Sequence, residues 1–189
     1  MSPHVTSTCA KCGVYKCRSP ELDGKYPSYC PHENYSDVRE KTVNEGWNNP
    51  ELKAINKTCD DVLNDGYGQW CRIKEVMEYC KRLGYKKLGL AFCVGLRDEA
   101  KVLCDILEKN DFEVVSVSCM AGAPNRQEVG FGPVKGMRSS QMVCNPLMQA
   151  EVLNREQTEL NIMLGLCVGS DRLLLRYSKA DVTPLVVKD

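Results

Sequence analysis

The 189-residue chain has little histidine and few large aromatic residues, with two His, two Trp and three Phe. It carries no net charge, because 25 basic residues balance 25 acidic ones, and the absence of a basic run argues against a nucleic-acid surface. No apolar stretch approaches the roughly 20 residues that a membrane helix needs, and the N-terminus lacks the apolar core of a signal peptide. We therefore expect a cytoplasmic protein that binds neither nucleic acid nor membrane.

Several catalytic motifs are also missing. The segment FCVGLRDEA, where a strand should lead into a helix, has neither G-x-G-x-x-G nor a P-loop lysine, which argues against a nucleotide-binding enzyme. The only C-x-x-C lies outside any strand–helix unit, which argues against a thiol redox enzyme. Both histidines lie near the N-terminal cysteines, so a Cys–His hydrolase is disfavoured as well.

What the chain has in excess is cysteine, with twelve residues. A reducing compartment disfavours disulfides, so this count favours metal or redox chemistry. Thiolate ligands select zinc or iron–sulfur clusters. The alternative is an exported or virally encoded disulfide protein, which a βαβ pattern farther along the chain contradicts.

Residues 1–31 form a Cys-rich segment with too few apolar side chains to fold alone, so metal binding should fold it. The x2 spacing of its first two cysteines lets both grip one ion, and Gly13 permits the tight turn that such a knuckle needs. The predicted ligands are Cys9, Cys12, Cys17 and Cys30, with His4 and His32 as second choices.

The identity of this metal is open from spacing alone. Zinc knuckles favour two closely spaced pairs, whereas Cys17 and Cys30 are twelve residues apart. A C-x2-C-x4-C run with a remote Cys-Pro has elements of ferredoxin ligation, which favours an iron–sulfur cluster, with zinc as the alternative.

Residues 32–189 predict an α/β domain with a helical lead-in at 32–86. Strands at 88–92 and 113–117 flank a helix at 97–109, which is a βαβ unit. The apolar run LNIML predicts a strand buried on both faces, and Pro146 suits the first turn of the preceding helix. A last strand at 183–187, with Pro184 near its start, completes a three-layer domain with a mostly parallel sheet.

Four cysteines follow strand tips or begin a helix in this domain: Cys93, Cys119, Cys144 and Cys167. The carboxyl ends of parallel strands meet at one sheet edge, so these thiols should converge into a second metal site there. The alternative is that they are small apolar core residues. We assign Cys80 and Cys104 to the core, and Cys71, at a helix start, is a further candidate ligand.

A long Gly-rich segment at 120–143 begins at the same edge. It carries Arg126, Lys135 and Arg138, which could receive a small anionic substrate or neutralise an anionic cluster. The alternative is a solvated loop without such a role.

The order GLAFCVGL, SVSC, CNP with QAEVLN, LNIMLGLCVG and SKADVTPLVVKD, behind N-terminal cysteines, resembles the DUF1847 family of bacteria and archaea. Its members are described as metal-binding proteins without an established reaction. In the family pattern a His follows the Gly after the position of Cys167, whereas this chain has Ser170 before Asp171. The resemblance implies metal binding and leaves the reaction undecided.

Together these features predict a Cys-ligated metalloprotein with two iron–sulfur sites, of the [4Fe-4S] kind, acting in electron transfer or as an iron–sulfur-dependent enzyme. A redox partner protein or a small anionic substrate would then be its partner. The alternative is a zinc-binding structural or interaction protein without catalysis.

Overall fold

The computed structural model describes residues 6–18, 26–132 and 141–188. The chain divides into two compact units, residues 1–57 and residues 58–189. Among the described residues, no helix is long and apolar enough to cross a membrane.

Unit 1 contains short helical elements joined by turns. They are the 3-10 turns η1 (Cys9–Lys11) and η2 (Lys16–Arg18), the helices α1 (Pro31–Asn34) and α2 (Ser36–Lys41), and the π-turn η3 (Thr42–Gly46). None of its described residues is buried. A segment without buried side chains gains little free energy from apolar burial, so its order must come from other interactions.

Two longer helices follow, as the sequence predicts. Helix α3 (Pro50–Gly66) begins at the proline, with Asn49 Oδ1 accepting hydrogen bonds from the N–H groups of Glu51 and Leu52. Helix α4 (Arg72–Leu83) ends at Gly84, whose φ of 78° is the left-handed conformation that glycine adopts readily.

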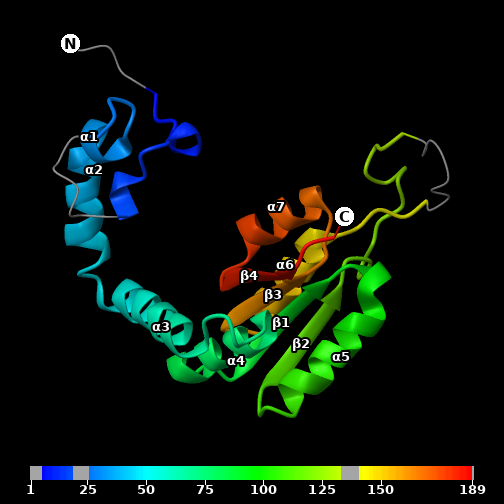
Figure 1. Cartoon of the computed structure of the whole chain (residues 1–189). Coiled ribbons are helices and arrows are strands. Elements are labelled where there is room, and N and C mark those ends of the chain that lie inside the picture. Colours follow the sequence, from blue (N-terminus) through cyan, green and yellow to red (C-terminus); the bar gives the residue numbers. More distant parts are fainter. Residues whose placement is uncertain (1–5, 19–25, 133–140, 189) are drawn as a thin grey trace. The chain divides into compact units, whose positions relative to one another are not determined.

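The sheet of unit 2 has four parallel strands in the order β2-β1-β3-β4 (Figure 1). They are β1 (Lys87–Phe92), β2 (Glu113–Ser118), β3 (Leu160–Leu164) and β4 (Asp181–Val186). The turn η4 (Val94–Leu96) and the helix α5 (Arg97–Glu108) connect β1 to β2, α6 (Pro146–Arg155) precedes β3, and α7 (Val168–Tyr177) connects β3 to β4. The predicted α/β class with a parallel sheet is confirmed.

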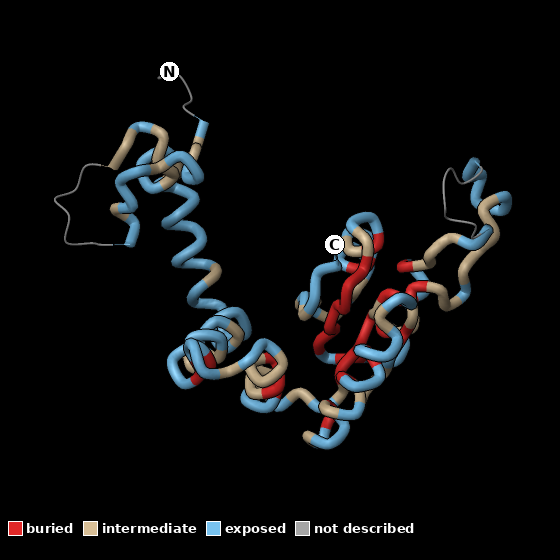
Figure 2. The backbone as a smooth tube through the Cα atoms, turned by 45° about the vertical axis from the view of Figure 1, so that its right-hand side comes forward, coloured by how far each residue is buried: buried red, intermediate tan, exposed pale blue. Residues whose placement is uncertain are grey.

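Helices cover both faces of this sheet, which makes three layers. Leu88 and Leu90 of β1 pack with α4 and α5, whereas Ala91 packs with α6 and α7 on the opposite face. All five residues of β3 are buried, as predicted for a strand covered on both sides. Figure 2 shows the buried residues gathered on the strands and on the helix faces turned toward them.

The last strand differs from its predicted position. It begins at Asp181 rather than Thr183, which places Pro184 in the middle of the strand. The pairing register with β3 shifts between Met163 and Leu164, next to this proline. Because β4 is an edge strand, it tolerates the missing N–H of Pro184 at such an irregularity.

Candidate functional site: a thiol cluster at the sheet edge

Four cysteines lie where chain segments leave the carboxyl edge of the sheet. Cys93 directly follows β1 and Cys119 directly follows β2. Cys144 lies two residues before α6, and Cys167 is the N-cap residue of α7 after β3. β1 and β3 are neighbours whose following helices cover opposite faces, so Cys93 and Cys167 lie at the topological switch point, the usual ligand position of such sheets.

Three of the four thiols are linked by short contacts. Cys144 Sγ lies 3.7 Å from Cys119 Sγ and 3.9 Å from Met120 Sδ. The Cys119 thiol also interacts with Cys93 Sγ. The structure therefore brings three of the four cysteines that were predicted to converge into contact, Cys93, Cys119 and Cys144, and it adds the thioether of Met120.

Lys188, which follows β4, completes the cluster. Its Nζ donates to Cys93 Sγ at 3.2 Å and to Cys167 Sγ at 3.3 Å. Lys188 was not among the predicted site residues, although the rule that placed the cysteines at the strand tips applies equally to the residues after β4.

The surroundings of Cys93 and Cys119 shift the pKa values of these two neighbouring thiols in opposite directions. Burial opposes ionisation of Cys93, but the N–H of Gly95 and the Lys188 ammonium outweigh burial and lower the pKa of Cys93. Burial raises the pKa of Cys119 to about 12, although the N–H of Val94 donates to its Sγ at 3.3 Å and opposes this rise. The hydrogen bonds to Cys93 and Cys167 raise the pKa of Lys188 in turn. Of the pair Cys93 and Cys119, Cys93 therefore loses its proton more readily.

Helix N-termini add positive potential at the same place. The N-terminus of α7 begins directly after Cys167, that of α6 follows Cys144, and that of α5 lies four residues after Cys93. Partial positive charge at a helix N-terminus stabilises an adjacent anion, so these ends favour thiolates or an anionic metal–thiolate group.

A half-buried carboxyl group, that of Asp171, lies in the first turn of α7. Burial raises the pKa of Asp171, against the opposing charge of Lys188, and its Oδ1 is buried without a hydrogen-bond partner. A carboxyl group in this position retains its proton more readily than an exposed one.

Gln149 of α6 holds two strand tips in place beneath the thiols. Its fully buried amide donates from Nε2 to Val117 O at 2.7 Å and to Phe92 O at 3.3 Å. Phe92 O also accepts from the N–H of Cys119 at 2.8 Å. The two carbonyls lie one residue before Cys93 and two residues before Cys119, so Gln149 helps to fix the spacing of these cysteines.

In unit 1 three of the four predicted ligands surround Tyr29. The backbone N–H groups of Tyr15 and Val14 donate to Cys12 and lower its pKa, and the Tyr29 hydroxyl donates to the same sulfur. The hydrogen bond to Cys12 and then burial raise the pKa of Tyr29, and the electrostatic influence of Cys12, Cys30 and Cys9 adds to this rise.

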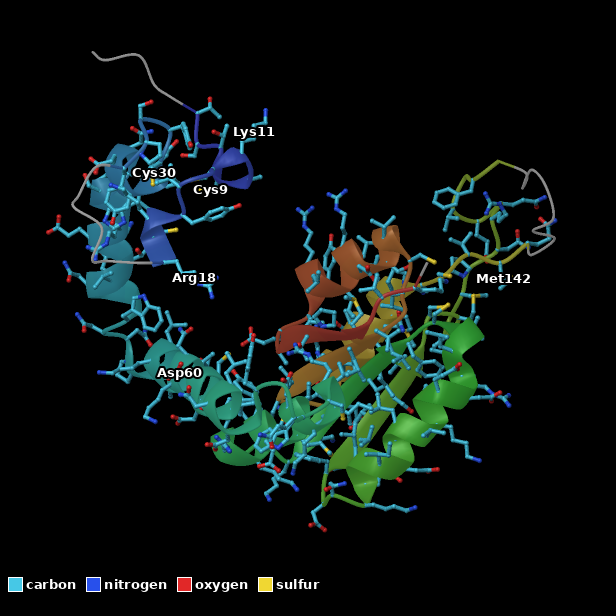
Figure 3. The ribbon with its side chains drawn as sticks, in the orientation of Figure 1. Cys9, Lys11, Arg18, Cys30, Asp60 and Met142 are labelled. Carbon is cyan, nitrogen blue, oxygen red and sulfur yellow. The ribbon has the colours of Figure 1, made fainter. Side chains whose placement is uncertain are left out.

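Figure 3 shows Cys9 and Cys30 in the same part of unit 1. Cys17 lies in η2 and is exposed. N–H groups that donate to Cys12 favour a thiolate there, and the metal knuckle that the C-x-x-C spacing predicts stays a prediction.

The remaining candidates are placed as follows. Cys80 is fully buried and its pKa rises to about 12 through burial, which confirms its core assignment, and burial likewise raises the pKa of Cys104. Cys71 is the N-cap residue of α4, as expected for a helix start. All twelve cysteines lie in the described ranges, each as a free thiol.

Polar candidates outside the clusters have other partners or fall outside the description. The ring of His32 stacks on Tyr26 at 4.3 Å. Arg126 donates from Nε to Gly132 O at 2.8 Å, within the loop that also carries Met142 (Figure 3). His4, Lys135 and Arg138 lie outside the described residues.

The side chains of the described residues are not grouped as a metal site, although the sheet-edge donors suit a metal chemically. Within the described residues, no three Cys, His, Asp or Glu side chains are grouped as a metal ion requires. At the sheet edge the Lys188 ammonium lies between Cys93 and Cys167 and serves as the local cation. Four thiols and a thioether fit a soft or borderline metal chemically, so both ligand assignments stay predictions.

Comparison with known proteins gives the family. Residues 30–185 match the model described as "Protein of unknown function (DUF1847)". The chain is 37% identical over 182 residues to the uncharacterized protein MJ0455 of Methanocaldococcus jannaschii. The matched region covers 96% of this chain and 86% of that protein. No solved structure matches the chain. The resemblance seen in the sequence is therefore confirmed, and the chain belongs to the DUF1847 family.

Proposed function

We propose that this protein is a cytoplasmic, cysteine-ligated metalloprotein that carries iron–sulfur clusters and acts in electron transfer or as an iron–sulfur-dependent enzyme. One site uses Cys93, Cys119, Cys144 and Cys167, and the other uses Cys9, Cys12, Cys17 and Cys30. The observation that carries this proposal is the position of four cysteines from four separate segments at one sheet edge, three of them linked through their sulfurs and Cys167 linked to Cys93 through Lys188. Cysteines that only fill the core would not be expected to gather at the carboxyl edge of the sheet, which is where ligands bind in such folds.

The electrostatics support an anionic centre at this edge. Three helix N-termini and an ammonium group surround the thiols, and all of them favour negative charge. Hydrogen bonds from N–H groups to cysteine sulfurs, such as Val94 to Cys119, are among the interactions that set the reduction potential of a cluster. When bound, a cluster would supply one-electron chemistry or an open iron as a Lewis acid.

For all four thiols to hold one cluster, Lys188 must leave the position between Cys93 and Cys167. Lys188 is an exposed residue beyond β4, so its side chain can turn toward solvent at little cost in free energy. The ammonium would then lie at the rim, where it could meet a small anionic substrate or an acidic patch on a redox partner.

A single distance favours a second candidate, a zinc protein. Zinc–sulfur bonds of about 2.3 Å in a tetrahedron place two sulfurs about 3.8 Å apart. The 3.7 Å between Cys119 Sγ and Cys144 Sγ matches that edge. A zinc site without turnover would make the protein a structural or interaction module.

The test is anaerobic purification of the full-length chain in which Cys9, Cys12, Cys17 and Cys30 are replaced by Ser. We expect a brown protein with iron, acid-labile sulfide and a reducible EPR signal, whereas a zinc protein would be colourless. In that background, replacing any of the four sheet-edge cysteines with Ser should lose or degrade the centre, while Cys104→Ser should keep it. Unchanged metal content in all four variants would reduce these cysteines to core residues.

A further inference from the structure

Lys188 divides the thiol cluster into two unlike halves. Cys93 and Cys167 share the ammonium group, at 3.2 and 3.3 Å. Cys119 and Cys144 instead lie against each other and against the thioether of Met120. The second half is a three-sulfur group, which we call the Met120 half-site, and Met120 is outside the ligand set of the proposed cluster.

The spacing of the Met120 half-site fits one ion with three sulfur ligands. Metal–sulfur bonds of about 2.3 Å in a trigonal plane give sulfur–sulfur edges of about 4 Å. The edges from Cys144 Sγ are 3.7 Å to Cys119 Sγ and 3.9 Å to Met120 Sδ. Both are close to the edge of such a plane.

The chemistry of the donors selects the ion. A thioether binds soft ions and contributes no charge, and a mixed thiolate–thioether set selects Cu(I) among biological metals. Zinc in structural sites takes four ligands, and iron–sulfur clusters are held mainly by thiolates, so neither uses this trio as it stands.

The surroundings of the half-site are apolar. Cys119 is 2% exposed, and both Met120 and Cys144 pack against the buried cluster formed with α6 and α7. A largely apolar, sulfur-lined site suits a monovalent ion, because replacing two thiol protons by one Cu(I) leaves only a single negative charge. The N–H of Val94, which donates to Cys119 Sγ, and the N-terminus of α6 lie beside that charge.

We propose that Cys119, Cys144 and Met120 form a binding site for one Cu(I) ion. Binding exchanges ions without a redox step: Cu(I) enters, and two protons leave from the two thiols. This site does not depend on the cluster of the proposed function. It is a site of the protein without a cluster, because the cluster would use Cys119 and Cys144 as well.

The test is an anaerobic titration of the metal-free, full-length chain with Cu(I) in competition with a Cu(I) chelator. Ser replaces Cys9, Cys12, Cys17 and Cys30 throughout, so that unit 1 does not compete. Loss of even an outer-shell partner typically costs 10- to 100-fold in metal affinity, so Met120→Leu should weaken Cu(I) binding by about tenfold or more. Zinc binding, which does not need a thioether, should be unchanged.

Met148→Leu is the matched control, because Met148 lies nearby against Gly122 and makes the same exchange of side chains. X-ray absorption should show three sulfur neighbours around copper in the parent and in this control, and two in Met120→Leu. Cys144→Ser should also abolish the tight site. Equal Cu(I) affinity in Met120→Leu and Met148→Leu would overturn the proposal, whatever the iron content of the protein as purified.

Discussion

Replacing Gln149 by Glu should make the stability of unit 2 strongly dependent on pH. The amide is 0% exposed and donates from Nε2 to Val117 O and Phe92 O. An ionised carboxylate donates nothing, so it would face two carbonyl oxygens as a buried, unpaired charge. The fold would respond by holding the new carboxyl group protonated, which raises its pKa.

The magnitude follows from the degree of burial. Full burial raises the pKa of a glutamate carboxyl group by about 3 from its usual value of about 4.3. Each pKa unit corresponds to about 1.4 kcal/mol. Because the folded-state pKa lies above the unfolded-state pKa, the loss of stability is smallest below about pH 4 and grows as the pH rises toward the folded-state value. At pH 8 the ionisation should cost about 4 kcal/mol, or roughly 8 to 16 °C in Tm for a chain of this size.

Thermal unfolding followed by circular dichroism at pH 5 and pH 8 measures this effect. Gln149→Met lacks both the hydrogen bonds and the charge, so its loss of about 1 to 3 kcal/mol should not vary with pH. Gln69→Glu, at an exposed position between α3 and α4, controls for added charge and should behave like the parent. If Gln149→Glu and Gln149→Met differ by the same amount at both pH values, the amide is not buried as described.

Three further outcomes are expected. Gly89→Ala should destabilise the sheet by about 1 to 3 kcal/mol in urea unfolding, because the added Cβ overlaps Asn161 Oδ1; unchanged stability would contradict this close packing. Chelation should make residues 6–18 sensitive to protease before unit 2 unfolds; equal digestion with and without metal would exclude folding by metal. In metal-free protein, N–H donors lower the pKa of Cys12, so it should be alkylated faster at pH 7 than Cys59, which mass spectrometry can check; equal rates would count against the knuckle geometry.

Local signals account for the parts of the fold and site that the sequence predicts well. The βαβ pattern fixes Cys93 and Cys119 at strand ends, and Pro146 marks a helix start near Cys144. The rule that parallel strands end at one edge then brings these thiols together without any knowledge of long-range packing. Convergence was predictable because it depends only on element order.

Side-chain partners were not predictable in the same way. The contact of Lys188 depends on the path of the chain after β4, which in turn depends on the register shift beside Pro184. The position of Met120 was implicit in its adjacency to Cys119, but whether its sulfur turns toward Cys144 is decided by packing beneath α6. Periodicity carries no information about either choice.

The strand order separates the two cysteine groups in time during synthesis. Cys9 to Cys30 leave the ribosome within one short segment, so the metal that we propose for them could bind before any strand of the sheet exists. At the sheet edge, β1 can first pair with β2, which brings Cys93 beside Cys119. The other side of β1 pairs with β3, which is synthesised later. Cys167 therefore joins last, and a growing chain presents a two-thiol site to its surroundings before it presents a four-thiol one.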